Sequence, residues 1–247
     1  MKDGKAGTNT TKITGDMYVT DQYGKKVVEY TGGALVDCKD AGKLNVALTD
    51  KDSFWTGVAA YDQYNDSYGP GGNTMHDIGE FNLYLANGAS WTNEQQAHVT
   101  TGTLDTEKQV WKGSQLASLH GGSDEAHAGI IYQKHEDPIF VENYSGYERV
   151  FYEHEKDDPA SIKGGAFKIA NAEEGSAITL ITDSTGLSSR WKETDDAVSR
   201  KQVSDVLNQL AGKLYYGNYK DGHLKGTVEI ADGLTVSSKP EVLSFYI

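Results

Sequence analysis

Two short stretches combine acidic residues with histidines, the side chains that most often bind a metal ion. They are residues 124–127 (DEAH) and residues 153–155 (EHE). Neither has the HExxH spacing that places two histidines on one face of a helix. In a strand, Glu153 and Glu155 would point to one face and His154 to the other, so the three side chains could not reach one ion. Both stretches are therefore predicted to be solvated acidic turns without a metal.

The chain also lacks the sequence motifs that are typical of nucleophilic catalysis and of phosphate binding. The chain has no Gly-x-Ser-x-Gly, GxGxxG or GxxxxGK[ST] motif, and Ser145 does not lie in a strand–turn–helix pattern. Cys38 is the only cysteine, so no internal disulfide can form, and we expect it to be a small structural residue. Paired carboxylates for glycoside cleavage come together only in the fold, and the sequence singles out none. We therefore predict no catalytic residue, no cofactor and no metal ligand.

One long glycine-containing segment carries tyrosines that could contact a ligand. Residues 61–79 read YDQYNDSYGPGGNTMHDIG and contain Tyr61, Tyr64 and Tyr68. Long loops on a rigid scaffold often carry binding residues, and a tyrosine ring can stack on a sugar while its hydroxyl forms hydrogen bonds. The alternatives are a decorated turn without a ligand and tyrosines that pack on the flank of the scaffold. The acidic and amide residues of this segment lack the EF-hand and nonapeptide-repeat spacings, so no calcium site is predicted.

The scaffold is indicated by a unit that occurs twice. Residues 44–55 read LNVALTDKDSFW and residues 81–91 read FNLYLANGASW. In both, alternating apolar residues predict a strand with one buried face, followed by a polar turn and a tryptophan. A second short strand is predicted after each turn, over residues 53–56 and 89–92. The repetition favours stacked coils of a solenoid, and an antiparallel sandwich is the alternative.

Further strand-like runs follow about every ten residues between residues 129 and 181, without helices between them, which is typical of an all-β fold. Apolar residues from Val198 to Leu214 then recur at spacings of three and four, which predicts an amphipathic helix over about residues 199–211. Strands are predicted again at 213–216, 225–230 and 242–247. We expect the helix and the C-terminal strands to cap the β-structure or cover one of its edges.

Composition limits the possible partners. Of the 247 residues, 37% are hydrophobic, 28 are glycine and 4 are proline, a composition that suits a thin core with many turns. The chain carries 36 acidic and 23 basic residues, a formal net charge of -13, which would repel nucleic acid and anionic membranes. No apolar run of about 18 residues is present that could span a membrane as a helix, and the N-terminal residues lack the apolar core of a signal peptide.

Residues 40–190 resemble the passenger region of pertactin-like autotransporter adhesins from diderm bacteria. The two tryptophan units are similar to the L-x-L-x-N-G-A-x-W coils of those passengers, and residues 141–186 are similar to successive coils near the passenger end. The second similarity is carried by Val141, Asn143, Ser145, Gly146, Gly165, Phe167, Ile178, Leu180 and Thr182. Residues 214–234 resemble inserts of some large members of that group.

The resemblance implies a right-handed parallel β-helix over residues 1–190. Residues 191–247 would form a short helix and a C-terminal β-hairpin extension that pack on or cap the solenoid. We expect an excised segment of a secreted protein at the cell surface, without enzymatic activity, inserted in no membrane, and acting in adhesion or as a stalk. Its partners would be host-surface glycans, extracellular proteins or neighbouring segments of the same parent chain. The alternative is a β-helix enzyme acting on polysaccharides.

Overall fold

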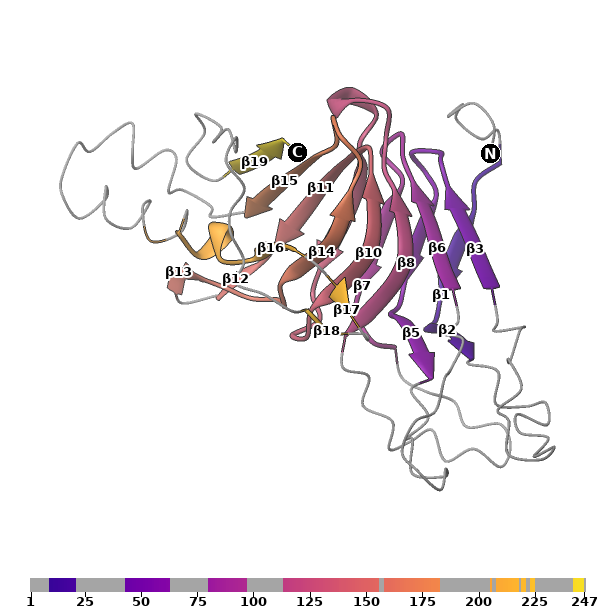
Figure 1. Cartoon of the computed structure of the whole chain (residues 1–247), viewed down its shortest axis with the longest axis horizontal. Helices are drawn as coiled ribbons and strands as arrows, with labels where there is room; N and C mark the ends of the chain where they lie inside the picture. The colour runs from indigo at the N-terminus through magenta and orange to yellow at the C-terminus, as the bar shows by residue number, and fades with distance from the viewer. Residues whose placement is uncertain are drawn as a thin grey trace, which may run out of the picture.

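The structure is a computed structural model in which two parallel β-sheets face each other (Figure 1). It describes residues 9–20, 43–62, 80–96, 113–155, 158–182, 205, 208–217, 219–220, 223–224 and 242–246. Nearly every described segment contributes to a strand.

The larger sheet has seven strands, and neighbouring strands run parallel except at the last pair. In spatial order these strands are β1 (Lys12–Thr14), β4 (Phe54–Thr56), β7 (Ser90–Asn93), β9 (Gly129–Gln133), β11 (Tyr147–Tyr152), β15 (Ala177–Thr182) and β19 (Val242–Tyr246). Strand β19 pairs with β15 in the antiparallel direction. The C-terminal strand therefore adds to the last parallel strand of this sheet.

The second sheet has six strands, all paired in parallel. Their order is β16 (Leu214–Tyr216), β14 (Phe167–Ala172), β10 (Ile139–Ser145), β8 (Ser114–His120), β6 (Glu80–Leu85) and β3 (Lys43–Leu48). Three smaller pairs complete the described strands. They are β2 (Met17–Thr20) with β5 (Ala59–Asp62), β12 (His154–Glu155) with β13 (Asp158–Ile162), and β17 (Tyr219–Lys220) with β18 (His223–Leu224).

The chain passes from one large sheet to the other at each step. Strands β3, β6, β8, β10 and β14 of the six-stranded sheet are each followed in sequence by a strand of the seven-stranded sheet, namely β4, β7, β9, β11 and β15. Both series keep the same spatial order, so each successive pair of strands stacks on the previous pair. The antiparallel sandwich is wrong for these strands, because their neighbours run parallel.

The two tryptophan units lie directly on each other, as their sequence similarity predicts. Val46 pairs with Leu83, and Trp55 pairs with Trp91. The indole rings stack with centroids 5.1 Å apart and an interplanar angle of 3°. The predicted turn at Asn87-Gly88 is confirmed, because both residues have positive φ, at 56° and 77°.

The core lies between the two large sheets. Its fully buried side chains include Leu48, Trp55, Leu85, Trp91, Leu119, Ile131, Ile139, Val150, Phe167 and Leu180. Burying each large aliphatic or aromatic side chain contributes about 1.5–3 kcal/mol, so these inward rows are the main source of stability. The alternation of buried and exposed positions along the strands follows from the two-residue period of the extended chain.

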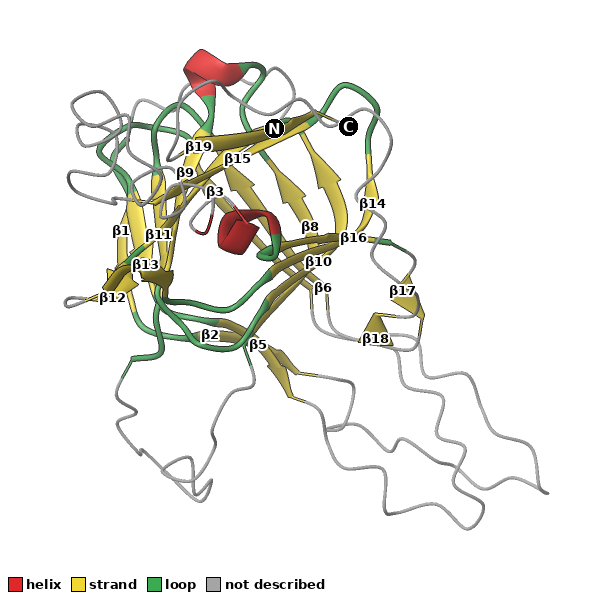
Figure 2. Cartoon of the chain, turned by 90° about the vertical axis from the view of Figure 1, so that its left-hand side faces the viewer, coloured by secondary structure: helices red, strands yellow, loops and turns green. Residues whose placement is uncertain are grey.

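The end of the stack near β15 and β16 is occupied by a helical turn (Figure 2). Residues 205 and 208–211 are helical, and Leu210 is fully buried in the core cluster. The Gln209 side chain accepts a hydrogen bond from the Ile162 backbone N–H at 2.9 Å. The helix predicted over residues 199–211 is thus confirmed at the positions that the structure describes. The strands predicted at 213–216 and 242–247 are confirmed as β16 and β19, whereas the strand predicted at 225–230 lies outside the described residues.

Candidate functional site

The tyrosines singled out as ligand contacts lie in or after strand β5. Tyr61 pairs with Val19 of β2 through its backbone, and its side chain is outside the described part of the chain. Tyr64 and Tyr68 also lie outside the described residues, as does the rest of residues 63–79. Their role in ligand binding stays a prediction.

Residues 124–127 form the exposed turn that the sequence predicts. Asp124 precedes a short 3-10 helix, η2 (Glu125–His127), and its carboxylate accepts the backbone N–H groups of Ala126 and His127. The His127 imidazole lies 2.7 Å from the same carboxylate oxygen, and this hydrogen bond is the main reason why the pKa of Asp124 lies below its ordinary value. No group of three or more potential metal ligands occurs within the described segments.

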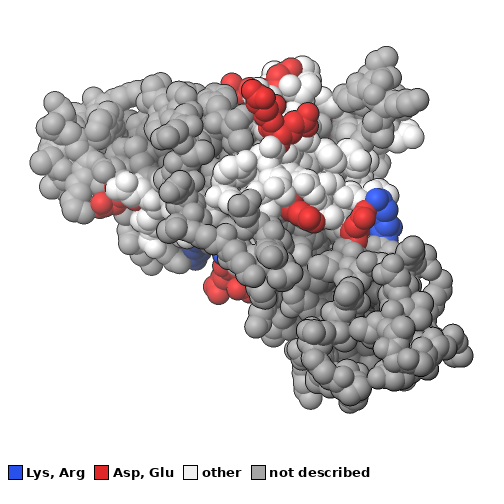
Figure 3. Space-filling model, in the orientation of Figure 1, with Lys and Arg blue, Asp and Glu red and all other residues white. Residues whose placement is uncertain are grey.

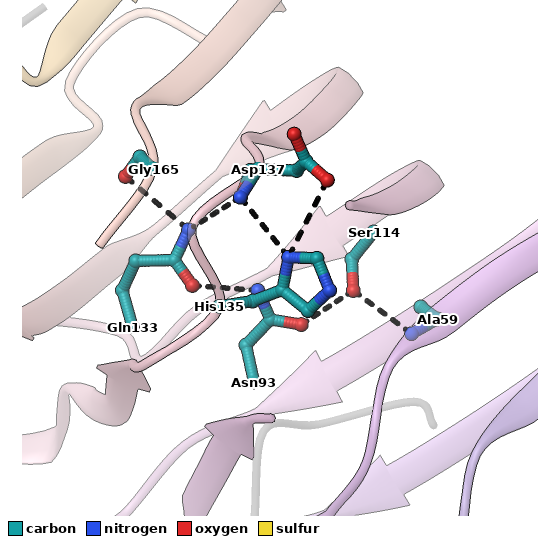
Figure 4. Close-up of polar contacts among 7 residues, drawn as sticks. All are labelled: Ala59, Asn93, Ser114, Gln133, His135, Asp137 and Gly165. Carbon is teal, nitrogen blue, oxygen red and sulfur yellow. Dashed lines mark hydrogen bonds and ion pairs between the residues drawn. The ribbon is translucent and has the colours of Figure 1, made fainter. Parts of the chain in front are cut away.

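Among the described residues, a connected set of polar side chains begins in the interior at the ends of β7 and β9 and extends toward the surface at Asp137, and we call it the inner polar cluster (Figure 4). The cluster consists of Asn93, Ser114, Gln133, His135 and Asp137. The Asn93 amide donates to the Gln133 side-chain oxygen at 2.6 Å, and its oxygen accepts the Ser114 hydroxyl at 2.5 Å. Asn93, Ser114 and Gln133 are almost fully buried.

The inner polar cluster joins segments that are far apart in the sequence. Ser114 accepts the backbone N–H of Ala59, and the Gln133 amide donates to the carbonyls of Asp137 and Gly165. The Asp137 backbone N–H donates to His135 Nδ1 at 3.0 Å, and the Asp137 carboxylate lies 3.9 Å from the same nitrogen. Because these buried groups satisfy one another, the cluster holds the chain in place rather than offering free groups to a substrate.

A second set of side chains, which we call the outer row, lies on the outward face of the six-stranded sheet. It contains Tyr84, His120 and Ser145, brought side by side by the parallel register of β6, β8 and β10. The Tyr84 and His120 rings stack with centroids 4.5 Å apart, and His120 Nδ1 lies 2.8 Å from Ser145 Oγ. Partial burial lowers the pKa of His120, while the charge of Glu173 acts in the opposite direction.

Nucleophilic catalysis first requires a serine within hydrogen-bond reach of a histidine, and the outer row has such a pair. It also requires hydrogen-bond donors for the oxyanion, and the backbone N–H groups beside this pair are not free. An acyl-transfer site needs N–H groups that are free to bind the developing oxyanion. The N–H groups of Gly121, Gly122 and Gly146, which flank the pair, already donate to Ser145 O, Tyr147 O and Ser176 Oγ. The outer row therefore suits ligand contact better than covalent chemistry.

Sequence reasoning did not find the pairing of His120 with Ser145. The two residues are separated by 25 positions, and only the register of β8 against β10 brings them together. No local catalytic motif marks either residue. This contact could have been located only if the register of β8 against β10 had been known beforehand.

The face of the molecule seen in Figure 3 shows more acidic than basic side chains among the described residues. Its exposed carboxylates on and beside the six-stranded sheet include Asp124, Glu125, Glu142, Glu173 and Glu174. Lys43 forms an ion pair with Glu80 at the edge of the sheet. Lys168 lies over the rings of Phe140 and Tyr215, with its ammonium 5.0 Å and 5.3 Å from the ring centroids. This face thus combines aromatic rings and hydrogen-bonding groups with a negative local charge.

Comparison with protein-family models, with curated proteins and with solved structures gave no match. Among the described residues, no helix has the length and apolar character needed to cross a membrane. The functional interpretation consequently depends on the arrangement of the strands and on the two side-chain sets, together with the sequence resemblance.

Proposed function

We propose that this chain is a non-catalytic segment of a bacterial surface protein, built as a right-handed parallel β-helix. The observation that carries the proposal is the in-register stacking of the two tryptophan units, one strand pair directly on the next. Passage of the chain between two parallel sheets at each step supports a solenoid, and connections between parallel strands are nearly always right-handed. The similarity to pertactin-like passengers supports display outside the cell.

Adhesion to a host glycan or an extracellular protein is the activity that this architecture suits best. The tyrosines of residues 61–79 and the outer row are the two candidate contact regions, because tyrosine rings can stack on sugars while their hydroxyls form hydrogen bonds. The acidic surface disfavours nucleic acid as a partner. A stalk role is the related alternative. In the described strands, β1 and β3 each have a neighbour on one side only, so their other edges fit a neighbouring segment of the same parent chain.

We expect the purified chain to bind saturably to at least one component of an array of host glycans and extracellular-matrix proteins, at low and at physiological salt. Binding through ring stacking and hydrogen bonds should persist at physiological salt, whereas purely ionic attraction should weaken. Absence of saturable binding at either salt concentration would contradict the adhesion role and favour a stalk.

Substitution variants then locate the contact. If the outer row binds the ligand, Tyr84→Ala should weaken binding about tenfold or more, because it removes a stacking ring. If residues 61–79 bind it, the double variant Tyr64→Ala, Tyr68→Ala should have that effect. Tyr132→Ala is the matched control, since Tyr132 is 38% exposed on the other sheet. Titration of each variant against the ligand found on the array measures the effect, and unchanged affinity in both test variants would exclude both regions.

A second candidate function is cleavage of a polysaccharide, which the exposed carboxylates near the outer row favour. Glu142 and Glu173 are exposed and lie on or directly after adjacent strands of the six-stranded sheet. Release of new reducing ends or unsaturated sugars from a panel of neutral and acidic polysaccharides would reveal this activity. Loss of that release in Glu142→Gln or Glu173→Gln would assign it to this face.

A further inference from the structure

Strand β11 carries a carboxylic acid that points into the core. Glu148 is 1% exposed, and neither oxygen of its carboxyl group has a hydrogen-bond partner within the described structure. Val150 and Tyr152, two and four positions further along the strand, are also buried, so Glu148 occupies the inward face of β11. A buried polar group without a partner is uncommon in a native protein and calls for an explanation.

The surroundings of Glu148 fit its side chain closely. Gly129 of β9 and Ile178 of β15 are its neighbours in the two adjacent strands. A side-chain carbon placed on Gly129 would lie 2.5 Å from Glu148 Oε2 and 2.6 Å from the carbonyl oxygen of Leu85, so a glycine is required there. The Glu148 side chain thus occupies space that is open because residue 129 is a glycine and has no side chain.

Within the described segments, no charged group compensates the carboxyl group, and burial is the one influence on its pKa. On the packed elements, its neighbours are the backbone of Gly129 in β9, Ile178 in β15 and Leu85 in β6. Tyr144 of β10 is a titratable group near Glu148, and its hydroxyl donates to the Ala177 carbonyl at 2.6 Å instead of to the Glu148 carboxyl group. Burial alone raises the pKa of Glu148 well above its ordinary value. The protonated acid is therefore the form that this packing accommodates.

We propose that Glu148 is a proton-dependent conformational switch in the core. The neutral acid packs under Gly129 and holds β11 between β9 and β15. The carboxylate requires water, because neither a hydrogen bond nor a cation replaces its hydration, so loss of the proton favours local opening of β11.

Local opening of β11 would affect the outer row at the surface, because only a few residues connect the two. Only Ser145, Gly146 and Tyr147 separate Tyr144 from Glu148, and Ser145 is the residue whose hydroxyl contacts His120. Gly122 and Tyr147 exchange two backbone hydrogen bonds at the same corner. Movement of β11 would therefore disturb the contact between His120 and Ser145, and the core acid would control the order of the outer row.

The direction of the pH dependence follows from the raised pKa. The stability contributed by the neutral acid is fully present below the ordinary carboxyl pKa of about 4.5, and it is lost as the pH rises through the raised value of the folded state. Native protein should accordingly become less stable from pH 5 toward pH 9. Variants that cannot ionise at this position should lose that part of the dependence.

Thermal unfolding from pH 5 to pH 9 tests the switch in the native chain, in Glu148→Gln and in Glu148→Leu. The control is Glu142→Gln, which makes the same chemical change at an exposed carboxylate of β10. We expect the difference in Tm between each Glu148 variant and the native chain to grow with pH, by on the order of 5 °C at pH 8 relative to pH 5. Parallel Tm curves for native and Glu148 variants would overturn the proposal.

Hydrogen exchange of the native chain gives a test that needs no variant to fold. After correction for the intrinsic rate, the amides of residues 147–152 should lose protection between pH 5 and pH 9, while those of residues 80–85 in β6 should change less. An equal change in both strands, or none, would also overturn the proposal. This measurement is independent of any ligand, so it separates failure of the switch from failure of the proposed adhesion role.

Discussion

Trp91→Ala is expected to lower the free energy of unfolding by about 3–5 kcal/mol, as truncation of a buried aromatic side chain typically does. Trp91 has no exposed surface, and its ring stacks on that of Trp55 at 5.1 Å. Its indole N–H donates to the Gly57 carbonyl at 2.9 Å. The substitution would leave a cavity between two stacked units and a carbonyl without its donor.

Two further variants separate these contributions. Trp91→Phe keeps a ring against Trp55 and loses the hydrogen bond, so we expect a smaller loss, since buried unpaired groups cost about 1–3 kcal/mol. Tyr132→Ala truncates an aromatic side chain that is 38% exposed and lies with its ring centroid 5.4 Å from that of Phe151, so a smaller loss of about 1 kcal/mol is expected. Urea unfolding followed by circular dichroism measures all three, because it does not depend on tryptophan emission. A Trp91→Ala protein as stable as the Tyr132→Ala protein would mean that the two tryptophan units are not stacked.

The tryptophan units were predictable because their local pattern and their tertiary role agree. Val46 and Leu83 alternate with outward residues, and the turn at Asn87-Gly88 uses residues that tolerate positive φ. Alternation alone does not distinguish parallel from antiparallel partners, since both bury every second residue. The repetition of the unit and the resemblance to β-helical passengers predicted the parallel direction, and the strand pairing in the structure confirms it.

The candidate site was largely beyond sequence reasoning, for two physical reasons. Periodicity places polar residues outside, whereas Asn93, Gln133 and Glu148 point inward and are almost fully buried. The partners of Asn93 and Gln133 are also remote, because these two residues are 40 positions apart and meet only through the register of β7 and β9. Inward polar residues that satisfy one another do not change the alternation around them, so they leave no local signal.

The turn of residues 124–127 shows the opposite case. Asp124 uses its side chain to satisfy backbone N–H groups two and three positions later, an interaction that short-range sequence rules describe well. Such a turn can be assigned as solvated without knowledge of the fold. Its nearness to the acidic face of the six-stranded sheet, by contrast, required the tertiary structure.

Asn93→Ala is the second substitution for which we expect a large effect, a loss of about 2–5 kcal/mol in the free energy of unfolding. The native amide donates to Gln133 and accepts from Ser114, and both partners are buried. Removing it leaves one acceptor and one donor unsatisfied in the interior, where water does not replace the lost bonds. The inner polar cluster also fixes Ala59 through Ser114, so the loss should loosen the contact between β5 and β8.

The matched control for this substitution is Asn171→Ala, which removes an amide from an exposed position of β14. Asn171 donates to the Glu142 carbonyl at 3.2 Å, but water can replace that bond at the surface. We therefore expect a loss of roughly 0.5 kcal/mol or less. Urea unfolding of both proteins makes the comparison, and hydrogen exchange at Ala59 reports the local effect, because the bond to Ser114 protects that amide. Equal stability of the two variants would show that the inner polar cluster is hydrated, and its role in holding β5, β7, β8 and β9 together would be wrong.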